Sequence, residues 1–448
     1  MRGAAVLLML AGLLAGCAAP PPAPPVAVAT QMPLPRVMSF GTTELQPPTR
    51  SNAEMARDFL DLSFQLESGQ ALPVFTRFEE PITIAVTGLP SAALEKELRR
   101  LTKRLESEAG LDVRRTADPA TATVTIEGVS TRDMQRSVPA AACFVLPTRI
   151  TWDEFRRAPR SPDYSWTRLT RRSAVSAFVP VDTSQQEIRD CLHEEIAQGL
   201  GPLNDLYRLG DSVFNDDNLN PVLTGFDMLM LRATYSPMLR SGMSREEVAA
   251  KLPAILDTLN PRGRRIADRG TPPSSAEWKA DISRALSPGS TSARRAAAGR
   301  AASESAPWGD VRSGFSLFTL GRMSITSDPE TALNAFLAAQ RIFESRPETK
   351  IHAAHAGFQI AAFALNSGQF DIVLDLTESY IPVARRHEDA ALLSDLELAR
   401  AAALAAAGRP QPDLRREALA WGVYAYGTAE RAAARAREIE TLAGGEGA

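Results

Sequence analysis

The stretch Cys191-Leu-His-Glu-Glu-Ile-Ala-Gln-Gly-Leu-Gly-Pro-Leu-Asn-Asp205 decides how the rest of this chain is interpreted. Apolar residues recur at helical spacing from Gln185 to Gln198, which predicts an amphipathic helix. Gly199, Gly201 and Pro202 follow and end that helix. Two adjacent carboxyl side chains are therefore expected on a helix that leads into a glycine-containing turn.

The polar residues of this stretch have the spacing of the zincin signature H-E-x-x-H-x-x-G-x-x-H, which they resemble in position but not in chemistry. In that signature two His one turn apart and a third His after a Gly turn hold zinc, and the Glu is the general base. Gly201 is kept here and Glu195 stands at the position of the base, whereas the His positions hold Glu194, Gln198 and Asn204. The stretch predicts the scaffold of a metalloprotease helix without its zinc ligands.

Ligand chemistry argues against a three-His zinc site in this region. Zinc prefers His nitrogen or Cys sulfur and accepts carboxylate, whereas a neutral amide oxygen is a poor ligand. His193 is the one His in this part of the chain, and its neighbours one turn later, Ile196 and Ala197, offer no second ligand. The remaining histidines are His352, His355 and His387.

Three interpretations of the stretch stay open. A calcium-type site would draw on the oxygen atoms of Glu194, Asp205 and Asp211. A metal-dependent hydrolase would use Glu195 as its base. The side chains around the metal of such an enzyme would be Glu194, Gln198, Asn204 and Asp205. The favoured interpretation is structural: these groups hydrogen-bond the loop after the helix. Zinc and calcium are both candidates, and neither is favoured.

The composition is that of a globular protein with two or three domains. The chain has 448 residues, of which 44% are hydrophobic and 23% charged, with a formal net charge of −3. This near-zero charge gives no electrostatic basis for binding nucleic acid, and no nucleic-acid partner is expected.

Residues 1–17 resemble the signal peptide of a bacterial lipoprotein. Arg2 precedes an apolar run from Ala4 to Leu14, which is too short to span a membrane, and Leu14-Ala-Gly-Cys17 resembles a lipobox. The resemblance implies that Cys17 becomes a lipidated N-terminus. Ala18 replaces the Asp that retains such proteins in the inner membrane, which favours a periplasm-facing protein on the outer membrane. The alternative is an ordinary signal peptide.

Residues 18–50 are expected to be a Pro-rich tether, since seven prolines lie between Pro20 and Pro35. Two cysteines, Cys143 and Cys191, remain once Cys17 is set aside, and an even count in an oxidising compartment predicts a disulfide between them. Two buried free thiols are the alternative.

Residues 51–259 are predicted to form an α/β domain. Alternating patterns predict strands over 81–88 and 121–128, and leucines at helical spacing predict a helix between them, capped by Ser91 and ended by Gly110. This order predicts a parallel strand pair. Further strands are expected over 141–146 and 173–181.

Two segments follow. Residues 260–307, rich in Pro, Gly, Ser, Ala and Arg, predict a disordered linker. Residues 308–448 predict helices throughout, including one from Asp413 to Ala443. The turns Ala364–Gly368 and Leu404–Gly408 resemble those of tetratricopeptide-type repeats, although they lie 40 residues apart. A plain helical bundle is the alternative.

Residues 52–259 also resemble an uncharacterised bacterial envelope family, catalogued as domain of unknown function 2927. The resemblance is carried by Glu194–Asp205, Ser212–Asp216, Leu223–Asp227, Met230–Pro237 and Gly242-Met243. The family is itself zincin-like and implies no activity. Pro202 departs from the family pattern, in the loop rather than at the site.

The expected fold class is α+β, with a zincin-like N-terminal domain and an all-α, helical-repeat-like C-terminal domain. The function that we expect is a lipid-anchored, non-catalytic binding or scaffolding protein of the cell envelope. Its membrane contact would be the lipid anchor, and its helical domain would bind a protein or peptide. The alternative is a metal-dependent, peptidase-like hydrolase, so enzymatic activity is left open.

Overall fold

The computed structural model describes residues 38–41, 45–139 and 141–444. Met38–Ala448 forms one compact unit. The predicted signal peptide, the lipobox with Cys17 and the tether as far as residue 37 lie outside the described residues. Within the described ranges, no helix has both the length and the apolar character needed to cross a membrane.

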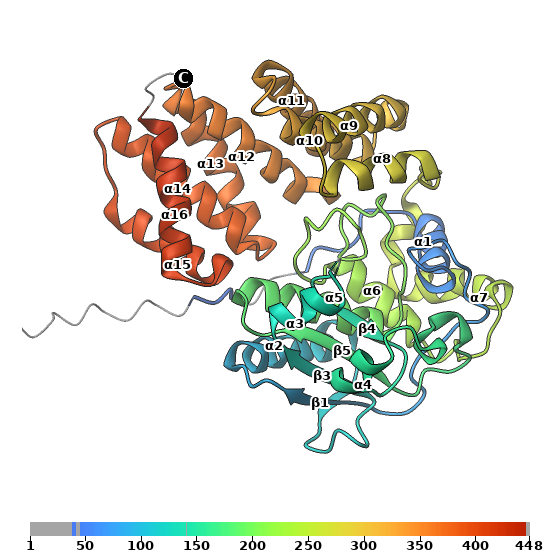
Figure 1. Cartoon of the computed structure of the whole chain (residues 1–448). Helices are drawn as coiled ribbons and strands as arrows, with labels where there is room; N and C mark the ends of the chain where they lie inside the picture. Colours follow the sequence, from blue (N-terminus) through green and yellow to red (C-terminus); the bar gives the residue numbers. More distant parts are fainter. Residues whose placement is uncertain (1–37, 42–44, 140, 445–448) are drawn as a thin grey trace, which may run out of the picture. The chain divides into compact units, whose positions relative to one another are not determined.

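A five-stranded mixed sheet is the centre of the first region, with the strand order β2-β1-β3-β5-β4 (Figure 1). The strands are β1 Ile82–Gly88, β2 Val113–Arg115, β3 Val124–Val129, β4 Phe144–Leu146 and β5 Val175–Pro180. All neighbouring strands are parallel except β4, which runs antiparallel to β5 at the edge. The predicted parallel pairing of 81–88 with 121–128 is confirmed by β1 and β3.

Helices accompany this sheet, and their ends carry the predicted caps. They are α1 Asn52–Phe64, α2 Ala92–Ala109, α3 Thr131–Ser137, α4 Trp152–Arg157, α5 Gln185–Leu200, α6 Gly225–Thr234 and α7 Arg245–Leu259. At the start of α2 the Ser91 side chain accepts the N–H of Leu94, and at its end Gly110 has a φ of 69°. The apolar faces of α1, α2, α5, α6 and α7 contribute to one hydrophobic core with the sheet.

The prediction of a disordered linker over residues 260–307 does not hold for most of that segment. It contains helices α8 Ala276–Leu286 and α9 Thr291–Ser305, capped by Ser275 and Ser290. Trp278 of α8 is fully buried, and its indole N–H donates to the Ser316 hydroxyl at 2.9 Å. The alanines and arginines that suggested disorder are also strong helix formers, while Pro, Gly and Ser gather in the turns over 270–275 and 287–290.

An all-helical region of stacked helices follows (Figure 1). Its helices are α10 Val311–Ser324, α11 Pro329–Glu344, α12 Lys350–Asn366, α13 Phe370–Arg386, α14 Ala390–Ala406, α15 Pro412–Tyr426 and α16 Ala429–Ala443. Gly368 and Gly408, in the predicted turns, have φ angles of 69° and 74°. The single helix expected from Asp413 to Ala443 is instead broken at Gly427, whose φ of 85° ends α15 before Thr428 caps α16.

Buried polar contacts join the helical region to the sheet region. The Tyr424 hydroxyl donates to Glu97 at 3.2 Å, and His352 Nε2 lies 2.7 Å from Asp217 Oδ2. All four of these side chains are buried. The two regions are therefore parts of one packed unit, which differs from the expected pair of domains on a flexible connection.

The last residues of the expected tether also belong to this unit. The ring of Phe40 stacks on Trp421 with 4.4 Å between centroids. Arg50 is buried and pairs with Asp58 at 2.9 Å. The described end of the 18–50 segment is thus held by Phe40 and Arg50. The proline content of the segment gave no indication of these contacts.

Candidate functional site

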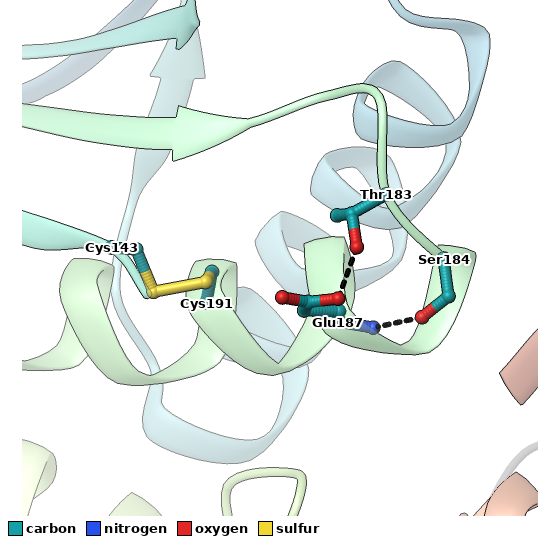
Figure 2. Close-up of a disulfide and its surroundings, with 5 residues drawn as sticks. All are labelled: Cys143, Thr183, Ser184, Glu187 and Cys191. Atoms are coloured by element: carbon teal, nitrogen blue, oxygen red, sulfur yellow. Dashed lines mark hydrogen bonds between the residues drawn. A yellow bond between two sulfur atoms is a disulfide. The ribbon is translucent and has the colours of Figure 1, made fainter. Parts of the chain in front are cut away.

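Two contacts hold the first half of α5, the signature helix that contains Glu194 and Glu195. One is a set of hydrogen bonds at its start, and the other is a disulfide in its middle. Ser184 caps it by accepting the N–H of Glu187, and the Thr183 hydroxyl also donates to Glu187 (Figure 2). A disulfide joins Cys191, in the middle of the helix, to Cys143, the residue before β4, with an S–S distance of 2.08 Å and 5.9 Å between the Cα atoms (Figure 2). The helix is thereby covalently attached to the edge of the sheet.

The C-terminal end of α5 is held by Arg172, a residue that sequence analysis did not identify. Its guanidinium donates to the carbonyl oxygens of Gln198, Gly199 and Gly201 at 2.7, 2.6 and 3.1 Å. A helix C-terminus carries partial negative charge and unpaired carbonyls, so a cation there is stabilising. Burial lowers the pKa of Arg172 to about 10, which leaves it charged at neutral pH. A lone Arg before a buried strand gives no sequence signal for this role.

The packing of the turn after α5 explains why Gly201, the Gly of the zincin-like spacing, is a glycine. A Cβ atom on Gly201 would lie 3.0 Å from Cγ2 of Thr234 in α6. Such a contact is tighter than ordinary packing, so the close approach of the two segments favours glycine. This residue of the signature has a packing role.

Five carboxyl side chains form what we call the carboxyl cluster: Glu67, Glu194, Glu195, Asp205 and Asp216. Electrostatic interactions link Glu194 to Glu195, Asp205, Asp216 and Glu67. Glu194 and Glu195 come from α5, and the others come from loops after α1, after α5 and before α6. The sequence-predicted residues Glu194, Glu195 and Asp205 are therefore brought together, and the structure adds Glu67 and Asp216.

Burial and mutual repulsion favour the protonated forms of this cluster. Burial, followed by the charges of Asp216 and Glu67, raises the pKa of Glu194 to about 7. Burial and then its acidic neighbours raise the pKa values of Glu195 and Asp205 well above their usual range. Only 4% of the surface of Glu195 is exposed, so little solvent is available to stabilise its ionised form. A protonated carboxyl cannot accept the proton that a general base removes.

The amides at the other signature positions are partly engaged by the backbone. The Asn204 amide donates to the Asp61 carbonyl at 3.0 Å, while its Oδ1 is buried without a hydrogen-bond partner. At Gln198 it is the backbone carbonyl that accepts a hydrogen bond, from the Arg172 guanidinium. The one side-chain hydrogen bond here goes from Asn204 to α1 rather than to the loop after α5, and Oε2 of Glu195 and Oδ1 of Asp205 are buried without a partner among the described residues. The structural interpretation of these positions stays a prediction.

The His193 side chain makes a structural hydrogen bond instead of serving as a metal ligand. Its Nδ1 accepts the N–H of Leu223 at 3.0 Å, which ties α5 to the start of the α6 loop. Burial, followed by the nearby arginines, lowers its pKa well below 6.5, so that the ring is neutral. In the described residues, no group of three or more His, Cys, Asp and Glu side chains has an arrangement that could hold a metal ion. The donor set therefore does not fit zinc.

A small cavity of about 170 Å³ lies next to the loop that follows α5. Asn204 and Tyr207 line it, together with Lys279 of α8. The Tyr207 hydroxyl hydrogen-bonds Asp216, which places this cavity beside the cluster. Burial raises the pKa values of Glu67 and Asp216, and the charge of Lys279 partly opposes that rise. Lys279 is a cation that the cluster receives from the segment expected to be disordered.

The pKa of Glu194 predicts an unusual dependence of stability on pH. The folded protein keeps this proton up to about pH 7, whereas the unfolded chain releases it near its usual pKa of 4.5. Folding is therefore favoured at low pH, and the free energy of unfolding falls as pH rises from about 5 to about 7. A change in pKa from 4.5 to about 7 corresponds to roughly 3 kcal/mol.

Glu194→Gln removes this titration, so its stability relative to the wild type is expected to rise with pH, by up to roughly 3 kcal/mol. Urea unfolding at about pH 5, 6, 7 and 8 measures the difference. Glu106→Gln, at an exposed carboxylate on α2, is the control and should show a flat difference. A flat difference for Glu194→Gln as well would contradict the buried, protonated state.

Comparison with known proteins finds a similarity to one family over part of the chain. Residues 52–254 match the family described as "Protein of unknown function (DUF2927)". Neither the curated proteins nor the solved structures contain a match to the chain. The matched residues include the signature helix and the carboxyl cluster, and the family's description names no activity.

Proposed function

We propose that this chain is a lipid-anchored protein of the bacterial cell envelope that binds or scaffolds other proteins and does not catalyse a reaction. It faces the periplasm, with Cys17 as its lipid attachment on the outer membrane. Its sheet region is a zincin-like scaffold that has lost its zinc ligands. Its helical region provides the surface for a protein or peptide partner.

The observation that carries this proposal is the burial and raised pKa of Glu195, the residue at the position of the general base. Glu195 is buried, and its acidic neighbours Glu194 and Asp205 raise its pKa together with burial. A catalytic base needs access to the substrate and an ionised carboxylate at the working pH. Burial limits access to Glu195, and its raised pKa disfavours the ionised form. Asn204, at a former ligand position, is bonded to the Asp61 carbonyl.

The partner-binding part of the proposal is supported by the architecture of α10 to α16. Stacked helices present extended surfaces, and here one side of the stack is already used against the sheet region through residues such as His352 and Tyr424. The binding surface of this proposal therefore belongs to the faces that point away from the sheet region. The packed contacts require the whole of residues 38–448 in any binding experiment.

A second candidate is a metal-dependent hydrolase. The acidity of the carboxyl cluster supports it, whereas the described residues contain no group already arranged to hold a metal ion. Five neighbouring carboxyl groups with a single nearby lysine, Lys279, form a strongly acidic environment. Bound cations stabilise such environments by restoring the ionised form of the carboxylates. Oxygen ligands of this kind suit calcium better than zinc.

Metal content separates the two candidates. The full-length protein should be isolated from membranes without chelators or metal affinity resins and analysed by elemental mass spectrometry. We expect substoichiometric zinc and no change in Glu194→Ala, with Glu106→Ala as the matched control. Stoichiometric zinc that is lost in Glu194→Ala would refute the non-catalytic proposal. One calcium per chain, also lost in that variant, would indicate a structural site and agree with a binding protein.

The same preparation tests the anchor. The wild type is expected in the membrane fraction, and Cys17→Ala is expected in the soluble fraction because the acyl chains are its attachment. Retention of Cys17→Ala in the membrane fraction would contradict the lipid anchor. This result is independent of the metal analysis.

A further inference from the structure

A cavity lies between the sheet region and the helical region, apart from the carboxyl cluster. Its volume is about 360 Å³, which is within the range of small-molecule sites. It is formed by three parts of the chain: the segment before α1, the loop between α5 and α6 with Arg104 of α2, and the turns that precede α12 and follow α13. Ligand sites occur preferentially where two such regions meet.

Most of the wall of this cavity is apolar. Pro and aliphatic or aromatic residues contribute it, namely Pro47, Pro221, Val222, Phe226 and Pro347. These residues would remove an apolar group of a ligand from water, which is the main source of affinity in small sites.

The charged groups of the cavity favour a negatively charged ligand. Three carboxylates line it, and each already has an arginine partner: Asp211 pairs with Arg50, Glu348 with Arg269 at 2.6 Å and Glu388 with Arg100 at 3.1 Å. Their charges are thereby neutralised by groups outside the lining.

Three cations also line the cavity: Arg104, Lys350 and Arg386. Arg104 pairs with Glu108 at 2.9 Å, and Lys350 pairs with Glu344 on the surface. Arg386, at the end of α13, forms no ion pair or hydrogen bond with any described residue. It is the cation that an incoming carboxylate would meet, and Arg binds carboxylates with directional, charge-assisted hydrogen bonds.

We propose that this cavity binds a small organic anion, with a carboxylate on Arg386 and an apolar group among Pro47, Pro221, Val222 and Phe226. The proposal goes beyond the binding of a protein partner, because it concerns a small ligand held between the two regions. It does not depend on the lipid anchor or on the protonation of the carboxyl cluster.

Octanoate and octanamide are matched probes for this site, since they share an apolar chain and differ in charge. Isothermal titration of residues 38–448 at neutral pH is expected to show one octanoate per chain and at least about fivefold weaker binding of octanamide. Arg386→Gln should weaken octanoate by about five- to tenfold and leave octanamide unchanged. Pro47→Trp, at an exposed lining position, should weaken both probes by filling the cavity.

Arg409→Gln is the matched control, because Arg409 is an exposed arginine of the same region away from the cavity. Unfolding midpoints equal to that of the wild type would show that the variants remain folded. Equal affinity for the two probes would overturn the proposal, as would octanoate binding that Arg386→Gln does not weaken or the absence of octanoate binding.

Discussion

Cys143→Ala/Cys191→Ala is expected to lower the free energy of unfolding by about 4 kcal/mol. The disulfide closes a loop with a sequence separation of 48 residues, and a cross-link of that span removes about this much conformational freedom from the unfolded chain. We also expect the edge of the sheet to be destabilised locally. The reason is that β4 is a three-residue edge strand and the disulfide is its covalent attachment to α5.

Urea unfolding with and without dithiothreitol measures this effect and contains its own control. The reductant is expected to shift the wild type to the midpoint of the double variant and to leave the double variant unchanged. A double variant that unfolds at the wild-type midpoint would show that β4 and α5 are held together without the disulfide.

Arg172→Met is expected to destabilise the protein by about 3 to 5 kcal/mol. Methionine fills much of the same volume but leaves the buried carbonyls of Gln198, Gly199 and Gly201 without a donor, and each such group costs about 1–3 kcal/mol. Part of this cost is offset because the variant no longer buries a charge, which is why the expected loss is below the sum of the three groups.

The neighbouring Arg171→Met is the matched control for this experiment. The Arg171 side chain is 55% exposed and pairs with Glu80 at the surface, so the expected change is within about 0.5 kcal/mol. Similar losses for the two variants would refute the role of Arg172 as the cation that terminates the signature helix.

A common physical feature links Arg172 and the carboxyl cluster. Both place ionisable groups near the end of α5 in surroundings that exclude water. Their ionisation responds in opposite ways. Arg172 remains charged and has three carbonyl acceptors. Glu195 and Asp205 lack cationic partners among their main interactions, and burial raises their pKa values well above the usual range. Buried carboxyls that have no cation beside them are expected to be neutralised in this way.

Much of the local structure could be predicted from the sequence. The strand pair β1 and β3, the cap at Ser91 and the end of α2 at Gly110 follow from short patterns. The predictions that did not hold depended on average composition: the segment 260–307 contains α8 and α9, and a single glycine, Gly427, divides the last predicted helix. Composition does not distinguish an alanine-rich linker from an alanine-rich helix that packs.

The site could be predicted only in part. Glu194, Glu195 and Asp205 were identified because they lie within one short stretch. Glu67 and Asp216 of the same cluster, and Lys279 beside it, were not identified. Asp216 lies in the loop after Asp205 without a spacing that marks it, and Glu67 and Lys279 are far away along the chain. No short-range pattern marks such residues, because their association arises only when the sheet, α5 and α8 pack together.

The sequence by itself determined local features such as the strand pair β1 and β3 and the caps of α2, because backbone hydrogen bonds and side-chain periodicity act over a few residues. Only the tertiary structure decided the raised pKa of Glu195, the burial of Arg172 and the cavity beside Arg386. These properties depend on desolvation and on charges contributed by distant segments, which exist only in the packed molecule.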